Sequence, residues 1–264
     1  MKKKNNILTN QETYITQYKQ EQRFVSILRV LIFVLFLAVW ETLSNFEIID
    51  SFFFSSPSRI CLLFIDMCKN LEIFIHTGIT LYETILSFLI VNLFSIFTAI
   101  LMLSFERFSK IIEPYLVILN SLPKSALAPL IIVWLGTGSK TIIVAGISVA
   151  IFGSIINLYT GFIQVDKEKL KLITTLGGNK KDQLLKVIVP SSIPIIISNM
   201  KVNIGLSLVG VIIGEFLAAR QGLGYLIIYG SQVFQLDLLI LSILILCIIA
   251  FLLYRSIDWI ERKI

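Results

Sequence analysis

The chain has 264 residues, of which 56% are hydrophobic and 15% charged, with a formal net charge of +6 and a mean hydropathy of +0.87. Soluble domains contain about 45–50% apolar and about 25% charged residues, so this composition excludes an ordinary soluble domain. The apolar residues form long runs, and about 20 apolar residues let a helix cross roughly 30 Å of membrane hydrocarbon. The composition therefore predicts an all-α integral membrane protein.

Six apolar runs are long enough to be membrane spans. They lie at residues 25–44, 84–105, 111–135, 141–164, 202–219 and 236–254. Backbone groups in lipid must be paired within the segment that crosses it, so these runs are predicted to be helices. The third run differs from the others because Pro123, Lys124 and Pro129 interrupt it.

The distribution of Lys and Arg predicts the orientation of the six spans. Both ends of the chain and the loops 106–110 and 165–186 fall on one side, and they hold sixteen of the 23 basic residues. Basic residues are enriched on the cytosolic side, so both termini are expected in the cytosol. Membrane topology thereby accounts for the net positive charge, because the basic loops lie against anionic lipid or face a cytosolic partner. No nucleic-acid partner is predicted.

This topology divides the chain into segments. They are a cytosolic tail at 1–24, a first span at 25–44, an outer segment at 45–78, a membrane core at 79–257 and a cytosolic C-terminal end at 258–264. Within the outer segment, Ser56 and Pro57 are typical of a helix start, with Ser as the N-cap and Pro in the first position. The apolar residues that follow have helical spacing and predict a short helix on the outer surface.

The interrupted third run is a candidate part of a pathway. Proline removes a backbone donor and clashes with the preceding turn, so Pro123 and Pro129 predict a broken helix. The break is either a kink where the span enters the outer interface or a feature that lines a pathway, as broken spans do in transporters. The pathway interpretation selects Pro123, Lys124, Pro129 and Trp134 as candidate residues.

The loop at residues 165–190 carries a second local pattern. Asp166 is a candidate N-cap, and Gly177 with Gly178 is typical of a helix end. Between them, four residues are expected to form one apolar side: Leu170, Leu172, Ile173 and Leu176. A second helical piece is expected at 181–189, ending before Pro190. The amphipathic helix either lies on lipid or docks into a groove of a soluble partner.

A charge inside a span costs roughly 2.5–3.5 kcal/mol on insertion, so Lys201 and Glu215, at the two ends of the fifth span, require a physical reason. Lys201, near the inner end of the fifth run, is expected to extend its ammonium group to the headgroups. Glu215, near the outer end of that run, is expected either to face the pathway or to pair with Arg220.

Residues for enzyme chemistry are sparse in the sequence. There is one histidine, His76, and no span carries two acids, so a metal-dependent or acid–base membrane enzyme is not predicted. The phosphate-binding pattern G-x-x-x-x-G-K-[ST] is missing, and the segment 136–140 is interpreted as a turn. We expect no cofactor and no metal on this chain, and an ATP-driven mechanism needs an ATPase on another chain.

The loop pattern resembles a known signature. Lys171-Leu-Ile-Thr-Thr-Leu-Gly177, nine residues and Val187-Ile-Val-Pro190 resemble the EAA signature of binding-protein-dependent ABC permeases, which reads Glu-Ala-Ala, three residues, Gly, nine residues and Ile-x-Leu-Pro. Lys171 stands where that signature has its acid. Residues 55–59, 123–138 and 214–225 resemble motifs of the nitrate/sulfonate/taurine branch, which usually has a basic residue where this chain has Glu83.

The resemblance, over roughly residues 55–255, implies the MetI-like permease fold and a bacterial plasma-membrane importer. It implies a second permease copy, ABC ATPase subunits that hold ATP and Mg, and an external binding protein that delivers a small solute. Residues 165–190 would then be the ATPase-coupling loop. The alternative from the residues alone is a secondary transporter driven by an ion gradient, with Glu215 as its coupling acid.

Overall fold

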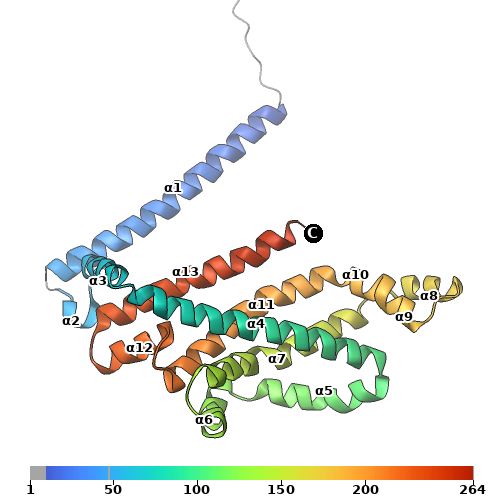
Figure 1. Ribbon diagram of the computed structural model, residues 1–264. Helices are drawn as coiled ribbons and strands as arrows, with labels where there is room; N and C mark the ends of the chain where they lie inside the picture. Colours follow the sequence, from blue (N-terminus) through green and yellow to red (C-terminus); the bar gives the residue numbers. More distant parts are fainter. Residues whose placement is uncertain (1–9, 47, 264) are drawn as a thin grey trace, which may run out of the picture. The chain divides into compact units, whose positions relative to one another are not determined.

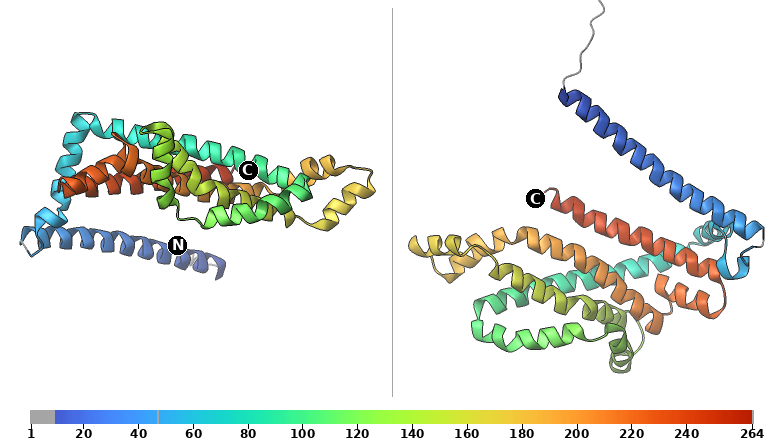
Figure 2. Two further views of the ribbon diagram at one scale, coloured as in Figure 1. Left: turned by 90° about the horizontal axis from the view of Figure 1, so that it is seen from below. Right: turned by 180° about the vertical axis from the view of Figure 1, so that it is seen from behind.

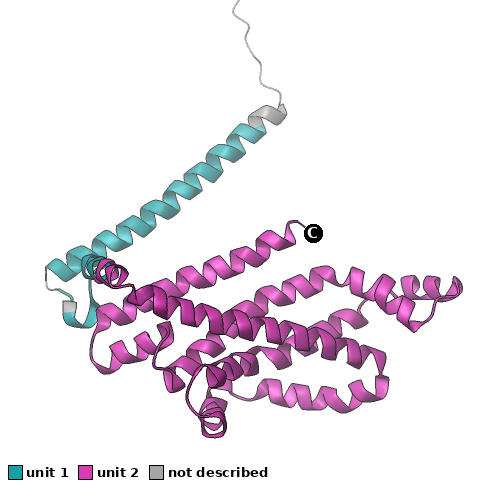
Figure 3. Ribbon diagram, viewed as in Figure 1, with its two compact units in different colours: residues 1–62 teal, residues 63–264 magenta. Residues whose placement is uncertain are grey.

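The computed structural model describes residues 10–46 and 48–263, and every regular element in those ranges is helical (Figure 1). The chain divides into two compact units, residues 1–62 and 63–264 (Figure 3). Five of the described helices are long and apolar enough to cross a membrane, and a bent pair of helices makes a sixth candidate. The predicted all-α architecture with about six spans is confirmed.

The first unit contains one long helix followed by a short capped turn. Helix α1 covers Asn10–Asn45, α2 covers Ser51–Phe54, and α3, Pro57–Lys69, begins in this unit. The predicted first span lies within α1, but the helix starts inside the segment expected as a tail, because no Gly or Pro interrupts residues 10–45. All side chains at 24–36 are exposed within this unit.

The predicted start of the outer helix is confirmed. Helix α3 begins at Pro57, and the Ser56 hydroxyl oxygen accepts a hydrogen bond from the Arg59 N–H at 3.4 Å. The Glu41 carboxylate accepts further bonds from the N–H and hydroxyl of Ser58, at 3.1 and 2.8 Å. These contacts join the end of α1 to the start of α3 within the first unit.

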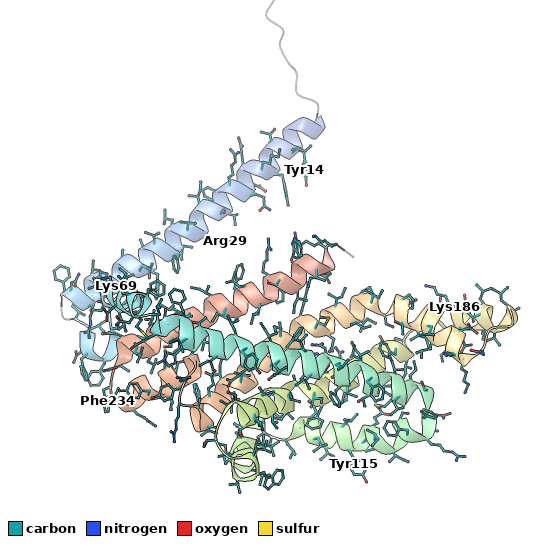
Figure 4. All side chains as sticks on the ribbon, viewed as in Figure 1. Tyr14, Arg29, Lys69, Tyr115, Lys186 and Phe234 are labelled. Carbon is teal, nitrogen blue, oxygen red and sulfur yellow. The ribbon has the colours of Figure 1, made fainter. Side chains whose placement is uncertain are left out.

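The second unit is a bundle of long helices with shorter helices at both ends (Figures 1 and 2). Its elements are α4 (Glu72–Ser104), α5 (Glu106–Ser121), α6 (Lys124–Leu135), α7 (Ser139–Ile163), α8 (Lys167–Thr175), α9 (Lys180–Gln183), a π-helical turn η1 (Leu184–Ile188), α10 (Val189–Ser191), α11 (Ile193–Ala218), α12 (Leu223–Gln232) and α13 (Leu236–Glu261). Lys186 and Phe234 mark opposite ends of this unit (Figure 4).

Several helices extend beyond the apolar runs that predicted them. Helix α4 begins at Glu72, inside the segment expected as the outer one, α11 begins at Ile193, and α13 continues to Glu261. Hydropathy marks only the part of a helix that prefers lipid, while the backbone ladder continues until a capping or breaking residue stops it. Helix α12 was not predicted, because ten residues are too few for a span.

Close packing of α4, α7 and α11 forms the centre of the bundle. An added Cβ at Gly210 on α11 would lie 2.7 Å from the Gly146 Cα and 2.9 Å from the Ala145 carbonyl oxygen on α7. An added Cβ at Gly146 would lie 2.6 Å from the Ser87 hydroxyl oxygen on α4. Small residues thus let three helix backbones approach one another, the usual basis of helix association in membranes.

Candidate functional site

The break in the third span lies between α5 and α6, whose axes are bent by 98°. The Lys124 ammonium group donates hydrogen bonds to the carbonyl oxygens of Leu119 and Asn120, at 2.7 and 2.8 Å. These carbonyls belong to the last turn of α5 and have no partners within the helix. Lys124 therefore caps the helix that Pro123 ends, which gives the intramembrane charge a structural role.

The other candidates of this stretch lie along α6. Pro129 is inside the helix, and Trp134 near its end is 72% exposed. After α6, the chain turns through Gly136 and Gly138, with φ of 77° and 128°, before α7 begins at Ser139. The interpretation of segment 136–140 as a turn is confirmed for residues 136–138, whereas residues 139 and 140 already belong to α7. The structure thus places Pro123, Lys124, Pro129 and Trp134 on one bent segment, whereas Glu215 lies on α11.

The loop at residues 165–190 forms a helical projection at one end of the bundle, seen in yellow in Figures 1 and 2. The Asp166 carboxylate accepts a hydrogen bond from the Glu168 N–H at 2.9 Å and caps α8. At the other end, Gly177 has a φ of 84°. The N–H groups of Gly177 and Gly178 donate hydrogen bonds to the backbone carbonyl oxygens of Thr174 and Ile173, at 3.0 and 2.9 Å. The predicted cap and the predicted Gly stop are both present.

The apolar residues of α8 divide between two faces rather than forming the single side expected from the sequence. Leu170 and Ile173 are half-buried, and Leu170 packs against the buried cluster that contains Phe162 and Ile188. Leu172 and Leu176 are 59% and 75% exposed. Consecutive residues lie roughly 100° apart around a helix, so the four residues expected on one side cannot share a single face. One face of α8 therefore contacts the bundle, and another is open.

The return segment differs from the prediction that it ends before Pro190. Helix α9, η1 and α10 follow one another, and Pro190 lies inside the helical path. Proline lacks an N–H and clashes with the carbonyl of a preceding α-helical turn. The wider π-helical turn at Leu184–Ile188 gives that ring room, so the chain continues without a stop.

Local hydrogen bonds cap α9 and hold it against α8. Asn179 and Asp182 form a reciprocal capping box, with both bonds at 3.0 Å, and the Gln183 amide nitrogen donates to the Leu170 carbonyl at 3.1 Å. The Lys186 ammonium group, at 2.8 Å, and the Asn179 N–H hold the pKa of Asp182 below its ordinary value. The shape of the projection is therefore encoded mainly by its own residues.

Glu215 lies in a buried polar site between α4 and the turn that joins α11 to α12. Its carboxylate accepts hydrogen bonds from the Thr80 hydroxyl at 2.7 Å and from the Gly224 N–H at 2.5 Å. In the same turn, the Gly222 N–H donates a hydrogen bond to Nδ1 of His76 at 2.9 Å. The expected alternative of a pair with Arg220 is wrong, because the carboxylate is fully buried and bonded to these groups instead.

Lys201 is neutralised by acids of another helix, a contact that the sequence did not predict. Its ammonium group forms ion pairs with Asp258 at 2.8 Å and Glu261 at 2.5 Å, and its side chain is 15% exposed. Both acids lie on the last turns of α13. The extension of the ammonium group to the headgroups stays a prediction, whereas its acidic partners were missed because they are 57 and 60 residues away in the sequence.

Sequence reasoning did not identify Thr80, His76 or Glu83 as neighbours of Glu215. Only Glu83 carried a local signal, as an acid beside the apolar run that begins at residue 84. These three residues come from α4, and Glu215 comes from α11, so their contact depends on helix packing.

Comparisons with known proteins agree with this architecture. Residues 91–264 match the family model described as "Binding-protein-dependent transport system inner membrane component". A Haemophilus influenzae protein described as a probable ABC transporter permease is 30% identical over 234 residues, which cover 89% of this chain and 95% of that protein. The taurine transport system permease protein TauC of Escherichia coli is 24% identical over 234 residues, covering 86% and 85% of the two chains.

The fold is also found among solved structures. A structure of the inward-facing MetNI methionine ABC transporter superposes with a TM-score of 0.62 at 16% identity, covering 71% of this chain and 94% of that chain. This likeness supports the predicted MetI-like fold. The chain therefore belongs to the family of binding-protein-dependent transport system inner membrane components, and it is a multi-pass membrane permease subunit of an ATP-binding-cassette importer.

Proposed function

We propose that the segment at residues 166–190 is the surface through which a separate ATPase subunit drives this permease. The observation that carries the proposal is the projection itself: α8 leaves the apolar bundle, is capped at Asp166, and stops at Gly177. Leu172 and Leu176 lie one helical turn apart and are exposed, as anchors for a groove require. ATP and Mg would be held by the partner ATPase.

The orientation follows from the same segment. Both chain termini and the projecting segment are proposed to be cytosolic, because the basic residues of the chain concentrate there. An ATPase that uses cytosolic ATP must dock on that side. The turn between α11 and α12 would then lie at the outer end, where a substrate-loaded binding protein would deliver its cargo.

The pathway is proposed to form between two copies of this chain. Two-fold pairing would use the same surface on each copy. Candidate lining residues are the bent segment with Pro123, Lys124, Pro129 and Trp134, because irregular backbone in a span is tolerated where it lines a cavity or is covered by protein. Glu215 remains a candidate pathway residue. Because it is fully buried within the chain, it would act on the pathway through the residues that line it.

The cargo is proposed to be a small solute of the nitrate/sulfonate/taurine class or a vitamin precursor. The resemblance of residues 123–138 and 214–225 to that branch supports this class, as does the similarity to a relative named for taurine. An ion-gradient-driven mechanism with Glu215 as its coupling acid is the alternative, and it requires no ATPase. Dependence of uptake on ATP or on an ion gradient separates the two.

Co-purification tests the docking surface. The tagged chain is extracted from native membranes in mild detergent, and the ATPase recovered with it is quantified for the wild type, Gly177→Leu and Leu172→Glu. We expect both variants to insert and to lose the ATPase by about 30-fold, as the loss of a central interface anchor of about 2 kcal/mol implies. Leu172→Glu leaves the backbone unchanged, so it separates lost contact from lost shape.

Phe234→Asn is the matched control for these variants. Phe234 is also an exposed apolar residue, at 61%, but it lies at the opposite end of the unit (Figure 4). Its φ of 57° suits asparagine. An ATPase retained by Leu172→Glu and lost by Phe234→Asn would place the contact at the other end and contradict the proposal.

A further inference from the structure

Two carboxyl groups lie fully buried beside each other at the α12 end of the bundle. Glu83 comes from α4 and Glu215 from α11, and each is 0% exposed. Among the residues that the structure describes, they are the two acids buried to this extent. Glu83 lies about one helical turn after Thr80 on α4, and the Thr80 hydroxyl donates a hydrogen bond to Glu215 at 2.7 Å, so both carboxyl groups occupy the same buried region. Nothing in the proposed transport function accounts for such a pair.

The hydrogen bonds of the two carboxyl groups differ. Both oxygens of Glu215 accept bonds, one from the Thr80 hydroxyl and the other from the Gly224 N–H. Neither oxygen of Glu83 makes a hydrogen bond, although Ser139 and Glu215 lie within electrostatic reach. An ionised carboxylate needs donors, so the surroundings of Glu215 suit the charged form and those of Glu83 suit the neutral acid.

The nearby groups supply no cation to balance a second negative charge. Nδ1 of His76 accepts the Gly222 N–H, so that nitrogen carries no proton, and its ring stacks on Tyr225. Glu72, one turn earlier on α4, adds another acid near this imidazole. Within the described residues neither Glu83 nor Glu215 forms an ion pair with a basic group.

The basic side chains of Lys140 and Arg220, at this end of the bundle, are exposed. Lys140 follows Ser139 on α7, and Arg220 lines a cavity of about 600 Å³ that Glu83 also lines. Water screens an exposed basic group, so such a group neutralises a buried acid only weakly. The cavity instead provides a short route for a proton between Glu83 and the outside.

Electrostatics then limits the charge of the pair. Removing one carboxylate from water costs several kcal/mol, and a second one beside it adds repulsion in a medium of low dielectric constant. Two carboxyl groups that share a site therefore retain a proton between them, as catalytic carboxyl dyads do. We propose that Glu83 and Glu215 form a proton-binding pair in which Glu83 holds the proton and Glu215 is the carboxylate.

The bound proton has a consequence for the fold. Thr80 accepts the Leu223 N–H at 2.8 Å while it donates to Glu215, so the pair sits where α4 holds the α11–α12 turn. If Glu83 releases its proton to water, two adjacent carboxylates repel each other across this contact. Protonation therefore closes this end of the bundle and deprotonation loosens it, independently of which ATPase or cargo the chain uses.

Infrared spectroscopy tests the proposal on the purified full-length protein. The C=O stretch of a protonated carboxyl group, identified by its shift in D₂O, is measured at neutral pH for the wild type, Glu83→Gln and Glu215→Gln. We expect the band in the wild type, its loss in Glu83→Gln and its retention in Glu215→Gln. Glu106→Gln is the control, because Glu106 is exposed and paired with Lys110. It should leave the band unchanged.

The result that overturns the proposal is equally specific. A band missing from the wild type would show that the pair holds no proton. A band that survives in Glu83→Gln or disappears in Glu215→Gln would show that Glu83 is not the group that holds it. If Glu83→Gln does not insert, Glu83→Met, which is neutral and similar in volume, replaces it.

A second measurement uses stability rather than spectroscopy. The folded protein is expected to bind one more proton than the unfolded chain, so its folding equilibrium weakens by up to about tenfold for each unit that the pH rises above about 4.3. The thermal midpoint of the wild type should therefore fall between about pH 6 and pH 8.5, relative to that of Glu83→Gln. Parallel curves for the two proteins would overturn the proposal.

Discussion

The centre of the bundle and the projecting segment at residues 166–190 are stabilised by interactions of different range. In the centre, five polar residues form one network across three helices. Asn203 donates to Asn92 and Ser154, both at 2.9 Å, Asn199 donates to Ser154 at 2.7 Å, and Asn157 donates to Asn199 at 3.0 Å. These contacts join residues 42 to 111 positions apart, so they exist only when the bundle is assembled.

The projecting segment depends on contacts between near neighbours. The caps at Asp166, Gly177 and Asn179 each involve residues at most five positions apart, and the bond from Gln183 to Leu170 spans 13. A change in this segment should therefore leave the bundle folded, whereas a change in the centre should affect the whole unit. This separation allows the proposed docking surface to be tested without unfolding the bundle.

The largest effect is expected where two helix backbones touch. Gly210→Ala places a Cβ against the Gly146 Cα and the Ala145 carbonyl of α7, and backbone atoms cannot move aside cheaply. We expect a loss of about 1–3 kcal/mol of stability, as overpacking of a core costs. Gly205→Ala on the same helix is the control, because its Cβ meets open space. Equal unfolding midpoints for the two variants in detergent would contradict the close contact.

A smaller effect is expected in the polar network. Asn203→Ala removes two hydrogen bonds and leaves the Asn92 carbonyl oxygen without its donor. Hydrogen bonds between membrane helices contribute about 0.6 kcal/mol on average and up to about 1.7, so we expect a loss of about 1 kcal/mol. Val202→Ala, at a neighbouring exposed position, should change the unfolding midpoint less. The opposite order would exclude a stabilising role for the network.

In the projecting segment, Gly177→Ala should act locally. The new Cβ meets no atom within 4 Å, so the cost of about 1 kcal/mol arises from the left-handed backbone alone. Hydrogen exchange at the amides of Gly178 and residue 177 should become faster, while the bundle amides keep their rates. Gly177→Asn is the control, because asparagine tolerates this conformation. Faster exchange throughout the bundle would contradict the local character of the segment.

The smallest effect is a pH dependence of the capping box. The Lys186 ammonium group and the Asn179 N–H lower the pKa of Asp182, so its stabilising contribution is complete above the ordinary value near 3.9 and is lost as the pH falls below it. Protection of the Asn179 N–H, corrected for the intrinsic exchange rate, should be constant down to about pH 5 and decrease below about pH 4. Asp182→Asn should remove that dependence. A decrease that begins near neutral pH would contradict it.

The same difference in range explains what the sequence could predict. The break at Pro123, the cap at Asp166 and the stop at Gly177 follow from residues close together in the chain, and the structure contains all three. The partners of Lys201 and Glu215 come from other helices, and hydropathy carries no information about which helices touch. The passage of the chain through Pro190 was also missed, because a π-helical turn has no clear sequence signal.

Photo-crosslinking tests the docking surface most directly. A photoreactive phenylalanine analogue is placed at Leu176 on the projecting segment or at Phe234 at the opposite end, both of them exposed. The complex is illuminated in native membranes, and the captured proteins are identified by mass. We expect an ATPase adduct at position 176 and none at position 234. An ATPase adduct at 234, or only lipid adducts at 176 while the ATPase still co-purifies, would contradict it.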